Sequence, residues 1–133
     1  LCRDWSSDVC SSDLSRVPYE IWLMPRLHNH QFENLAPGEK RRNLAGLLGR
    51  TLRRLLQVTP NFHMVLHTAP NTLQTKGELS QYWRTIAGDY HWHFEILPIV
   101  ESRSKSYSIK EVYFNGTMPE QAAEKLRQLD PGK

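Results

Sequence analysis

Four short segments of this chain alternate or concentrate apolar residues in the way that predicts β-strands. They are residues 19–25, 62–67, 90–100 and 106–114. The segments carry aromatic and β-branched side chains, and a Pro, Asn or Gly at or near the end of each favours a turn. Segment 90–100 has the strongest pattern, although Pro98 interrupts it, and segment 106–114 has the weakest.

Leucines at three- and four-residue steps predict a helix over residues 37–57, because these steps place side chains on one face of a helix. The leucines are Leu44, Leu47, Leu48, Leu52, Leu55 and Leu56. Pro37 suits the first helical position. The other face carries Lys and Arg side chains, which we interpret as a solvated face. A second helix is predicted over 119–129, and a short one around 78–86 within the long connection 72–89.

The order strand, helix, strand, strand, strand, helix predicts an α+β fold, in which helices cover an antiparallel sheet on one side. A length of 133 residues corresponds to one small domain or to part of a larger protein. The aromatic content and the charge fraction exclude a disordered chain. No apolar run approaches the roughly 18 residues that a membrane helix needs, so the sequence predicts no membrane span.

Residues 1–14 differ from the rest of the chain because they are rich in Ser and Asp. Residues 4–14 resemble the translation of a common sequencing-library adapter. We therefore expect residues 1–14 to be an adapter artefact, and residues 15–133 to be the native domain of a chain that began further upstream. Both cysteines, Cys2 and Cys10, lie in the first segment, which removes support for a disulfide in the domain. A genuine Cys2–Cys10 pair is the alternative.

The net charge of the chain is +3, from 17 basic and 14 acidic side chains. Residues 1–14 contain one Arg and three Asp, so the remaining residues carry 16 basic and 11 acidic side chains and a net charge of +5. A mild positive charge does not by itself indicate a nucleic-acid partner. It suits an anionic small molecule equally well, and we expect neither a nucleic-acid nor a membrane partner.

The stretch 91–95 (His-Trp-His-Phe-Glu) carries the most informative chemistry of the chain. On an extended strand His91, His93 and Glu95 project from one face, and the residues between them face the core. His67 ends the preceding predicted strand, and it reaches the same site if the two strands are neighbours. Imidazole nitrogens together with a carboxylate suit zinc or iron, and a pair of imidazoles also suits a phosphate group.

Histidines on a strand are also common as ordinary surface or hydrogen-bonded side chains, and that alternative stays open for the cluster. It is the favoured interpretation for His28, His30 and His63. Glu95 has three interpretations that the sequence leaves open. It is a metal ligand, a partner that orients a ligand imidazole, or a solvated charge.

Several motifs occur in a fixed order along the chain: Tyr-Glu-Ile-Trp-Leu-Met-Pro (19–25), Leu-His-Thr-Ala-Pro (66–70), His-Trp-His-Phe-Glu-Ile-Leu-Pro (91–98) and Pro-Glu-Gln-Ala-Ala-Glu-Lys-Leu (119–126). Together they resemble the C-terminal half of galactose-1-phosphate uridylyltransferases, which belong to the histidine-triad superfamily. The resemblance covers about residues 17–129. It implies a histidine-triad-like antiparallel sheet with helices packed on it.

The resemblance also implies a site for zinc or iron formed by His67, His91 and His93. In the family the fourth ligand is a Glu of the N-terminal half, which is absent here. The family's nucleophilic histidine also belongs to that half, so we expect no catalytic residue in this chain. His93 is the alternative nucleophile, because it lies where a histidine-triad hydrolase has its reactive histidine.

The family's sugar-phosphate contacts suggest Tyr107, Lys110 and Asn115 as substrate-binding residues. An exposed edge strand is the alternative for this region. Residues 106–111 (Ser-Tyr-Ser-Ile-Lys-Glu) depart from the family's pattern, which weighs against galactose as the sugar.

The resemblance implies that the parent protein is a nucleotidyltransferase that moves a uridylyl group between UDP-glucose and a hexose 1-phosphate, in galactose metabolism. We expect the chain alone to be inactive and to need its missing N-terminal half. Another histidine-triad enzyme, such as a nucleotide-sugar phosphorylase or a nucleotide hydrolase, is one alternative. A non-catalytic metal-binding structural domain is the other. A homodimer and a cytoplasmic location are also expected.

Overall fold

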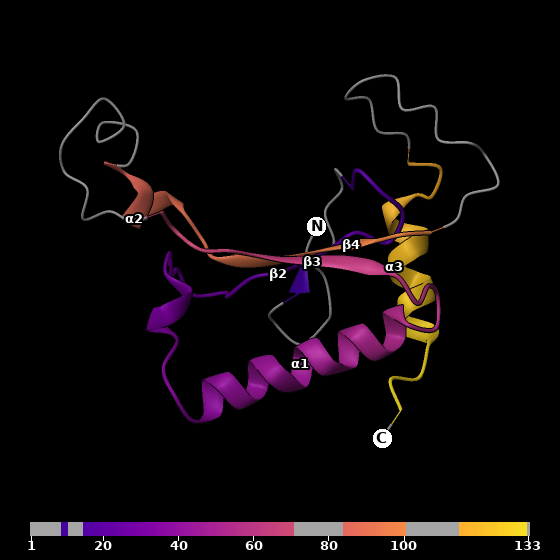
Figure 1. The fold of residues 1–133 in the computed structure, drawn as a ribbon, viewed down its shortest axis with the longest axis horizontal. Coiled ribbons are helices and arrows are strands. Elements are labelled where there is room, and N and C mark those ends of the chain that lie inside the picture. Colours follow the sequence, from indigo (N-terminus) through magenta and orange to yellow (C-terminus); the bar gives the residue numbers. More distant parts are fainter. Residues whose placement is uncertain (1–8, 11–14, 71–83, 101–114, 133) are drawn as a thin grey trace.

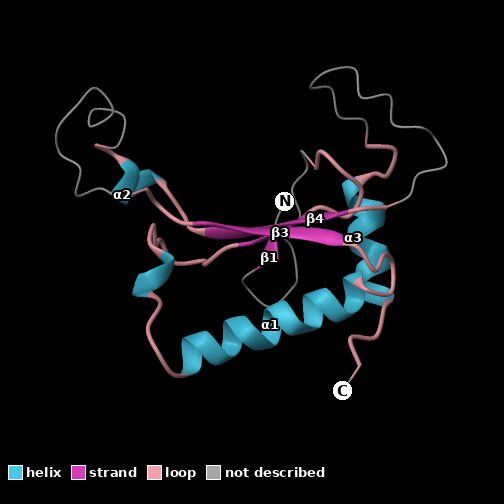
Figure 2. Cartoon of the chain, in the orientation of Figure 1, coloured by secondary structure: helices cyan, strands magenta, loops and turns pink. Residues whose placement is uncertain are grey.

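The computed structural model describes residues 9–10, 15–70, 84–100 and 115–132, and the structural statements below concern these residues (Figure 1). In chain order, the elements are β1 (Val9–Cys10), β2 (Ile21–Leu23), a 3₁₀ turn η1 (Phe32–Asn34), α1 (Glu39–Leu55), β3 (Phe62–His67), α2 (Ile86–Asp89), β4 (His93–Pro98) and α3 (Pro119–Gln128). Figure 2 shows them coloured by type.

The described strands form one antiparallel sheet in the order β1-β2-β4-β3. Strand β4 therefore lies between β2 and β3. Glu95 of β4 pairs with Trp22 of β2 and with Val65 of β3, and His93 pairs with His67. Paired residues of antiparallel strands project to the same face of a sheet. Polar side chains from β2, β4 and β3 consequently meet on one face.

Helix α1 lies along the other face of the sheet, while α3 stands at one end and α2 at the opposite end (Figure 1). The core lies between α1 and the sheet. Its members are Ile21, Leu23, Leu47, Leu55, Ile96 and Leu126, each at most 7% exposed. Burying a side chain of this kind stabilises a fold by about 1.5–3 kcal/mol. The leucine spacing of the sequence therefore determines which face of α1 packs on the sheet.

The predicted helices form, with differences at their ends. Helix α1 begins at Glu39 rather than at the predicted residue 37, because Gly38 has a φ of 87°, which a right-handed helix does not accommodate. Helix α3 begins at Pro119, as predicted. Helix α2 covers only Ile86–Asp89. Most of the short helix predicted around 78–86 lies outside the described residues.

Three of the predicted strands form. Strand β3 has the predicted bounds, whereas β2 and β4 are shorter than the predicted 19–25 and 90–100. Strand β4 begins only at His93, which leaves His91 outside the strand. The strand predicted over 106–114 lies outside the described residues.

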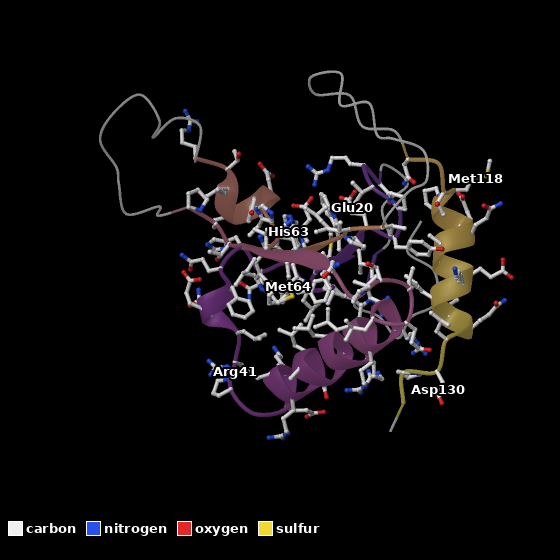
Figure 3. The ribbon with its side chains drawn as sticks, turned by 45° about the vertical axis from the view of Figure 1, so that its right-hand side comes forward. Glu20, Arg41, His63, Met64, Met118 and Asp130 are labelled. Carbon is white, nitrogen blue, oxygen red and sulfur yellow. The ribbon has the colours of Figure 1, made fainter. Side chains whose placement is uncertain are left out.

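Strand β3 lies at the edge of the sheet, and its side chains alternate between the two faces as predicted. In Figure 3, Met64 points toward α1 and His63 points to the opposite side. Among the described strands β3 pairs with β4 alone, and Met64, Val65 and Leu66 are between 38% and 43% exposed. Backbone pairing with β4 therefore stabilises β3 more than the burial of these three side chains does.

These elements confirm the predicted α+β class, with an antiparallel sheet and helices packed on it. Among the described helices, none is long and apolar enough to cross a membrane. Val9–Cys10, within the segment expected to be an adapter artefact, pair through their backbones with Leu23 and Trp22. Any extended segment can form such a short backbone pairing, because it involves no particular side chains. That residues 1–14 are an adapter artefact therefore stays a prediction.

Candidate functional site

Three aromatic rings stack on the sheet face opposite α1, which no described helix crosses and which we call the open face. The His93 ring of β4 lies 4.8 Å, centroid to centroid, from the Trp22 ring of β2 and 4.8 Å from the His67 ring of β3. The ring planes differ by only 14° and 21°. The sequence placed His67 beside His93 on the condition that their strands are neighbours, and the structure meets that condition.

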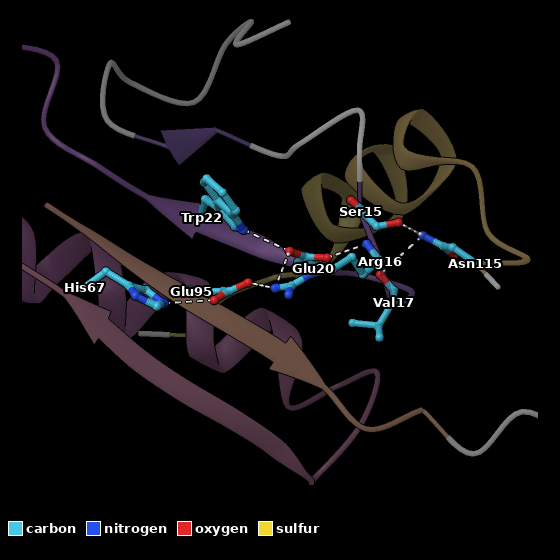
Figure 4. A network of polar contacts seen from close by, with 8 residues as sticks. All are labelled: Ser15, Arg16, Val17, Glu20, Trp22, His67, Glu95 and Asn115. Carbon is cyan, nitrogen blue, oxygen red and sulfur yellow. Dashed lines mark hydrogen bonds and ion pairs between the residues drawn. The ribbon is translucent and has the colours of Figure 1, made fainter. Parts of the chain in front are cut away.

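Glu95 joins His67 to Arg16 on the same face (Figure 4). Its Oε2 atom lies 2.9 Å from Nε2 of His67, and its Oε1 atom forms an ion pair with the Arg16 guanidinium. Glu95 is only 7% exposed, which excludes the solvated-charge interpretation. A buried carboxylate is stable in its charged form only when partners of this kind surround it. The contact with His67 is of the kind that orients an imidazole, and the role of Glu95 beside a metal ligand stays a prediction.

A second carboxylate holds Arg16 in place. Glu20 forms an ion pair with the Arg16 guanidinium at 3.5 Å, and it accepts a hydrogen bond from the Arg16 backbone N–H at 2.5 Å. Oε1 of Glu20, the oxygen that forms the ion pair, also accepts a hydrogen bond from Nε1 of Trp22 at 2.9 Å, while Oε2 accepts the backbone bond. A continuous network therefore runs from Trp22 through Glu20, Arg16 and Glu95 to His67 (Figure 4).

These hydrogen bonds determine which nitrogen of each stacked imidazole carries the proton. The Glu95 carboxylate accepts, so Nε2 of His67 carries the proton and Nδ1 keeps its lone pair. Nδ1 of His93 lies 3.1 Å from the carbonyl oxygen of His91, which also accepts, so in the uncharged imidazole Nε2 of His93 has the lone pair. Each imidazole thus offers one lone-pair nitrogen, the form in which histidine binds metals or attacks phosphorus.

The surroundings shift the pKa of two groups on the open face. Burial lowers the pKa of His67 below its ordinary value of 6.5, and the neighbouring His93 and Arg16 lower it further, because positive charges disfavour another one. Burial raises the pKa of Tyr90 above its ordinary value of 10.0, and the Tyr90 ring lies 6.1 Å from that of His93. At neutral pH His67 is therefore uncharged and Tyr90 keeps its proton.

His91 belongs to a different cluster. Its Nε2 atom lies 3.1 Å from Nδ1 of His28, and its Nδ1 atom lies 3.3 Å from the carbonyl oxygen of Pro25. The two imidazoles meet edge to face, with their centroids 4.7 Å apart. The backbone N–H of Trp92 donates to the carbonyl of Asn29 at 3.0 Å. The segment after β2 and the segment before β4 consequently run side by side here.

The predicted metal ligands His67, His91 and His93 do not come together as one group. In the part of the chain that the structure describes, no three His, Cys, Asp or Glu side chains are placed to hold a metal ion. The reason is that β4 begins at His93, so His91 does not share the strand face and contacts His28 instead. The three residues do not fit a metal ion in this arrangement, and zinc or iron stays a prediction from the resemblance.

Of the candidate substrate-binding residues, Tyr107 and Lys110 lie outside the described residues, and Asn115 is described. Nδ2 of Asn115 donates to the carbonyl oxygens of Ser15 at 3.1 Å and Val17 at 3.3 Å (Figure 4). Its Oδ1 atom accepts from the backbone N–H two residues further along. Asn115 therefore ties two distant segments together, and its contact with substrate stays a prediction.

The sequence did not single out Arg16 and Trp22, whereas His28 is a hydrogen-bonded surface histidine, as the favoured interpretation had it. The opposite charges of Arg16 and Glu20, four residues apart, were a signal for an ion pair. Nothing local, however, linked that pair to β4. His28 follows β2 as His91 precedes β4, so antiparallel pairing of these strands brings the two histidines together. Strand order was the missing information in each case.

Comparisons with known proteins relate this arrangement to characterised relatives. No protein-family model matches the chain. Its sequence is 26% identical over 114 residues to ADP-glucose phosphorylase from Arabidopsis thaliana, and this alignment covers 84% of the chain and 30% of that protein. The structure matches a GalT-like protein from Arabidopsis thaliana with a TM-score of 0.72 and 24% identity, over 96% of this chain and 40% of the other.

A solved uridylyltransferase matches with a TM-score of 0.66 and 25% identity, over 90% of this chain and 37% of the other. The chain has a GalT-like fold. GalT stands for galactose-1-phosphate uridylyltransferase, so the family resemblance seen in the motifs is confirmed, together with the histidine-triad-like fold. The chain spans between 30% and 40% of the length of these relatives. Within the GalT-like fold, the stacked His67–His93 pair lies on the open face.

Proposed function

We propose that this chain is the sugar-phosphate-binding part of an enzyme that transfers a nucleotidyl group between a nucleotide sugar and a hexose 1-phosphate. The observation that carries the proposal is the stacked His67–His93 pair on the open face of a GalT-like fold. The named relatives support the reaction class, since they are a phosphorylase of ADP-glucose and uridylyltransferases. The ordered motifs favour UDP-glucose and a hexose 1-phosphate of galactose metabolism as substrates, while the departures at residues 106–111 weigh against galactose itself.

The chemistry of the open face suits a phosphate group. Protonation of Nε2 of His93 creates an N–H donor for a phosphate oxygen, while Nδ1–H stays bonded to the His91 carbonyl. Arg16 adds a positive charge, and its side chain is 44% exposed although two carboxylates contact the guanidinium. Binding of a sugar phosphate therefore needs no rearrangement of the stacked rings.

We further propose that this chain alone transfers no nucleotidyl group, because the family's nucleophilic histidine belongs to another part of the protein. The missing N-terminal half is then the partner that completes the site. A homodimer and a cytoplasmic location stay predictions from the fold family and the composition.

A nucleotide-sugar phosphorylase or nucleotide hydrolase with His93 as its nucleophile is the second candidate function. The similarity to ADP-glucose phosphorylase and the lone pair on Nε2 of His93 favour it. In that reaction Nε2 attacks a phosphorus atom, the bond from phosphorus to the leaving oxygen breaks, and that oxygen takes up a proton. A second nucleophile, phosphate or water, then releases the nucleotidyl group from the imidazole.

Calorimetric and NMR titrations of the purified chain test the proposal. The ligands are glucose 1-phosphate, galactose 1-phosphate, UDP-glucose and ADP-glucose, each up to about 10 mM, which saturates a site with a Kd of about 1 mM. We expect saturable binding of a hexose 1-phosphate, with shifts of the His67 and His93 ring resonances. His93→Ala is expected to weaken binding at least about tenfold.

The matched control is His63→Ala, an exposed histidine on β3 that should leave the affinity unchanged. A preference for UDP-glucose over ADP-glucose supports the uridylyltransferase form, and the reverse preference supports the phosphorylase form. Absence of saturable binding for all four ligands would contradict the proposed function. Turnover of a nucleotide sugar by the chain alone, lost in His93→Ala, would favour the second candidate.

A further inference from the structure

We propose that the outer face of helix α1 is a docking surface for an acidic α-helix of a partner protein. The surface, which we call the arginine stripe, consists of Arg42, Arg50 and Arg53 with Gly46 and Gly49 between them. It faces away from the sheet and is therefore separate from the open face (Figure 1). On this side of α1 no described element runs along the helix, apart from the tail after α3 at one end (Figure 1).

Helix α1 carries all the excess positive charge of the chain after residue 14. It contains six basic side chains and one acidic side chain, which gives a net charge of +5. Residues 15–133 contain 16 basic and 11 acidic side chains, so outside α1 there are 10 of each. The positive charge of this part of the chain is therefore concentrated on one helix and is not spread over the surface.

The helical repeat separates the arginines of α1 from its buried residues. Thr51 and Leu55 are buried on the side of the sheet, whereas Arg42, Arg50 and Arg53 are exposed. The arginines are separated by eight and three residues, which are close to whole numbers of turns, so they lie along one face. Arg53 is two residues from both Thr51 and Leu55, and two residues amount to about half a turn. The arginines therefore project away from the sheet.

Among the described residues, no carboxylate neutralises the arginine stripe, since neither Arg42, Arg50 nor Arg53 forms an ion pair there. The Nε atom of Arg53 donates a hydrogen bond to the carbonyl oxygen of Pro131, in the tail after α3, at 2.6 Å. A carbonyl oxygen accepts a hydrogen bond but carries no net charge. This bond consequently orients the guanidinium and leaves its charge uncompensated.

The two glycines allow the guanidinium groups to lie close to the helix backbone. A terminal nitrogen of Arg50 lies 3.4 Å from the position that a Cβ atom of Gly46 would take, and the same distance separates Arg53 from Gly49. Glycine is less favourable than alanine within a helix, and the arginines are the only described groups that an added Cβ atom would meet here. A second helix can therefore approach this face closely.

An acidic helix suits the arginine stripe better than other anionic partners do. Arginine binds a carboxylate through two N–H groups, and carboxylates at three- and four-residue steps repeat at the same helical pitch as the stripe. A membrane surface needs apolar side chains that insert, whereas the apolar side of α1 packs on the core. Single-stranded nucleic acid stacks on aromatic side chains, and α1 has none. Duplex-binding proteins contact about 6–10 phosphates, more than three arginines neutralise.

NMR titration of the isotope-labelled full-length chain with a synthetic helical peptide provides the test. The peptide is about 18 residues long and rich in Ala and Gln, with Glu at three- and four-residue steps on one face. A second peptide has the same composition but has its Glu residues distributed around the helix. We expect saturable shifts of the α1 backbone amides with the first peptide, at a Kd of about 1 mM or tighter in about 50 mM salt. The second peptide should bind at least about fivefold more weakly.

Two double variants show whether the arginine stripe is responsible. Arg42→Gln with Arg50→Gln should weaken binding of the first peptide at least about tenfold. Arg26→Gln with Arg84→Gln is the matched control, because it removes two exposed arginines elsewhere, and it should change the affinity less than about twofold. Gly46→Gln should weaken binding about threefold or more without lowering the free energy of unfolding, since glutamine favours a helix more than glycine does.

Equal binding of the two peptides, or equal weakening in the two double variants, would show a non-specific attraction between charges and would overturn the proposal. Absence of binding up to about 5 mM peptide would also overturn it. So would tighter binding of an oligouridylate or of phosphatidylserine vesicles than of the first peptide at the same salt concentration. No probe is a sugar phosphate and the readout lies on α1, so these outcomes are distinguishable from a failure of the proposed function.

Discussion

Glu95 connects the parts of the open face, because its carboxylate contacts both His67 and Arg16. The residue is nearly buried, so the two contacts replace the hydration that the charge would have in water. Removing a partner of such a carboxylate lowers the free energy of unfolding by more than the bond itself contributes. The reason is that the carboxylate stays buried without that partner.

At the scale of one residue, replacement of Glu95 by Gln tests how much the charge of this carboxylate stabilises the fold. The amide has nearly the same shape but loses the charge, so we expect Glu95→Gln to lower the free energy of unfolding by about 1.5–3 kcal/mol. Urea unfolding at neutral pH measures the change. Glu124→Gln, on an exposed position of α3, is the control and should stay within about 0.5 kcal/mol of the wild type. Equal effects of the two substitutions on the free energy of unfolding would show that the contacts of Glu95 do not stabilise the fold.

The pKa of His67 provides a second prediction at this scale. NMR titration of the metal-free chain should place this pKa below 6.5, and Arg16→Gln should raise it, because a neighbouring positive charge is removed. The folded chain holds this proton less tightly than the unfolded chain does. His67 therefore destabilises the fold progressively as the pH falls from 6.5 through its folded pKa, and it has no such effect above 6.5. A measured pKa above 6.5 would contradict this predicted direction of the shift.

Helix α1 and the sheet are joined by apolar contacts that the leucine spacing predicts. Leu55 is fully buried against the sheet, whereas Leu56, which the predicted leucine stripe also included, comes directly after the end of α1 and is 50% exposed. The two positions share a residue type and a place in the chain and differ in the face that they occupy. They form a matched pair for testing how the helix is oriented.

At the scale of the element, Leu55→Ala should lower the free energy of unfolding by about 2–5 kcal/mol, because it leaves a cavity in the core. Leu56→Ala should lower it by less than about 1 kcal/mol, since water already reaches much of its side chain. Urea unfolding followed by circular dichroism compares the two variants. A larger loss for Leu56→Ala would show that α1 packs on the sheet by another face.

At the scale of the whole molecule, the contribution of residues 1–14 is open to a direct test. The described residues of this segment, Val9–Cys10, pair with β2 at the edge of the sheet. Each backbone hydrogen bond contributes about 0.5–1.5 kcal/mol, and ordering each residue costs about 1–2 kcal/mol. Deletion of residues 1–14 should therefore change the free energy of unfolding by less than about 1 kcal/mol. A loss of more than about 2 kcal/mol, measured by urea unfolding, would show that the segment is part of the domain.

The sequence alone determined the elements whose side-chain pattern is local. The leucine steps predicted α1, the alternation around His63 and Met64 predicted β3, and Pro119 marked the start of α3. The ordered motifs also predicted the GalT-like fold. Such features are readable because a helix or a strand repeats its burial pattern within a few residues.

Only the tertiary structure decided which strands are neighbours. The order β2-β4-β3 placed Glu95 between His67 and Arg16, and it left His91 beside His28 and away from the stacked pair. These contacts join residues between 28 and 79 positions apart, as the numbering of each pair shows. Side-chain periodicity shows which face of a strand is buried, but it does not show which strands are neighbours. Strand order follows from the burial of the whole sheet against α1.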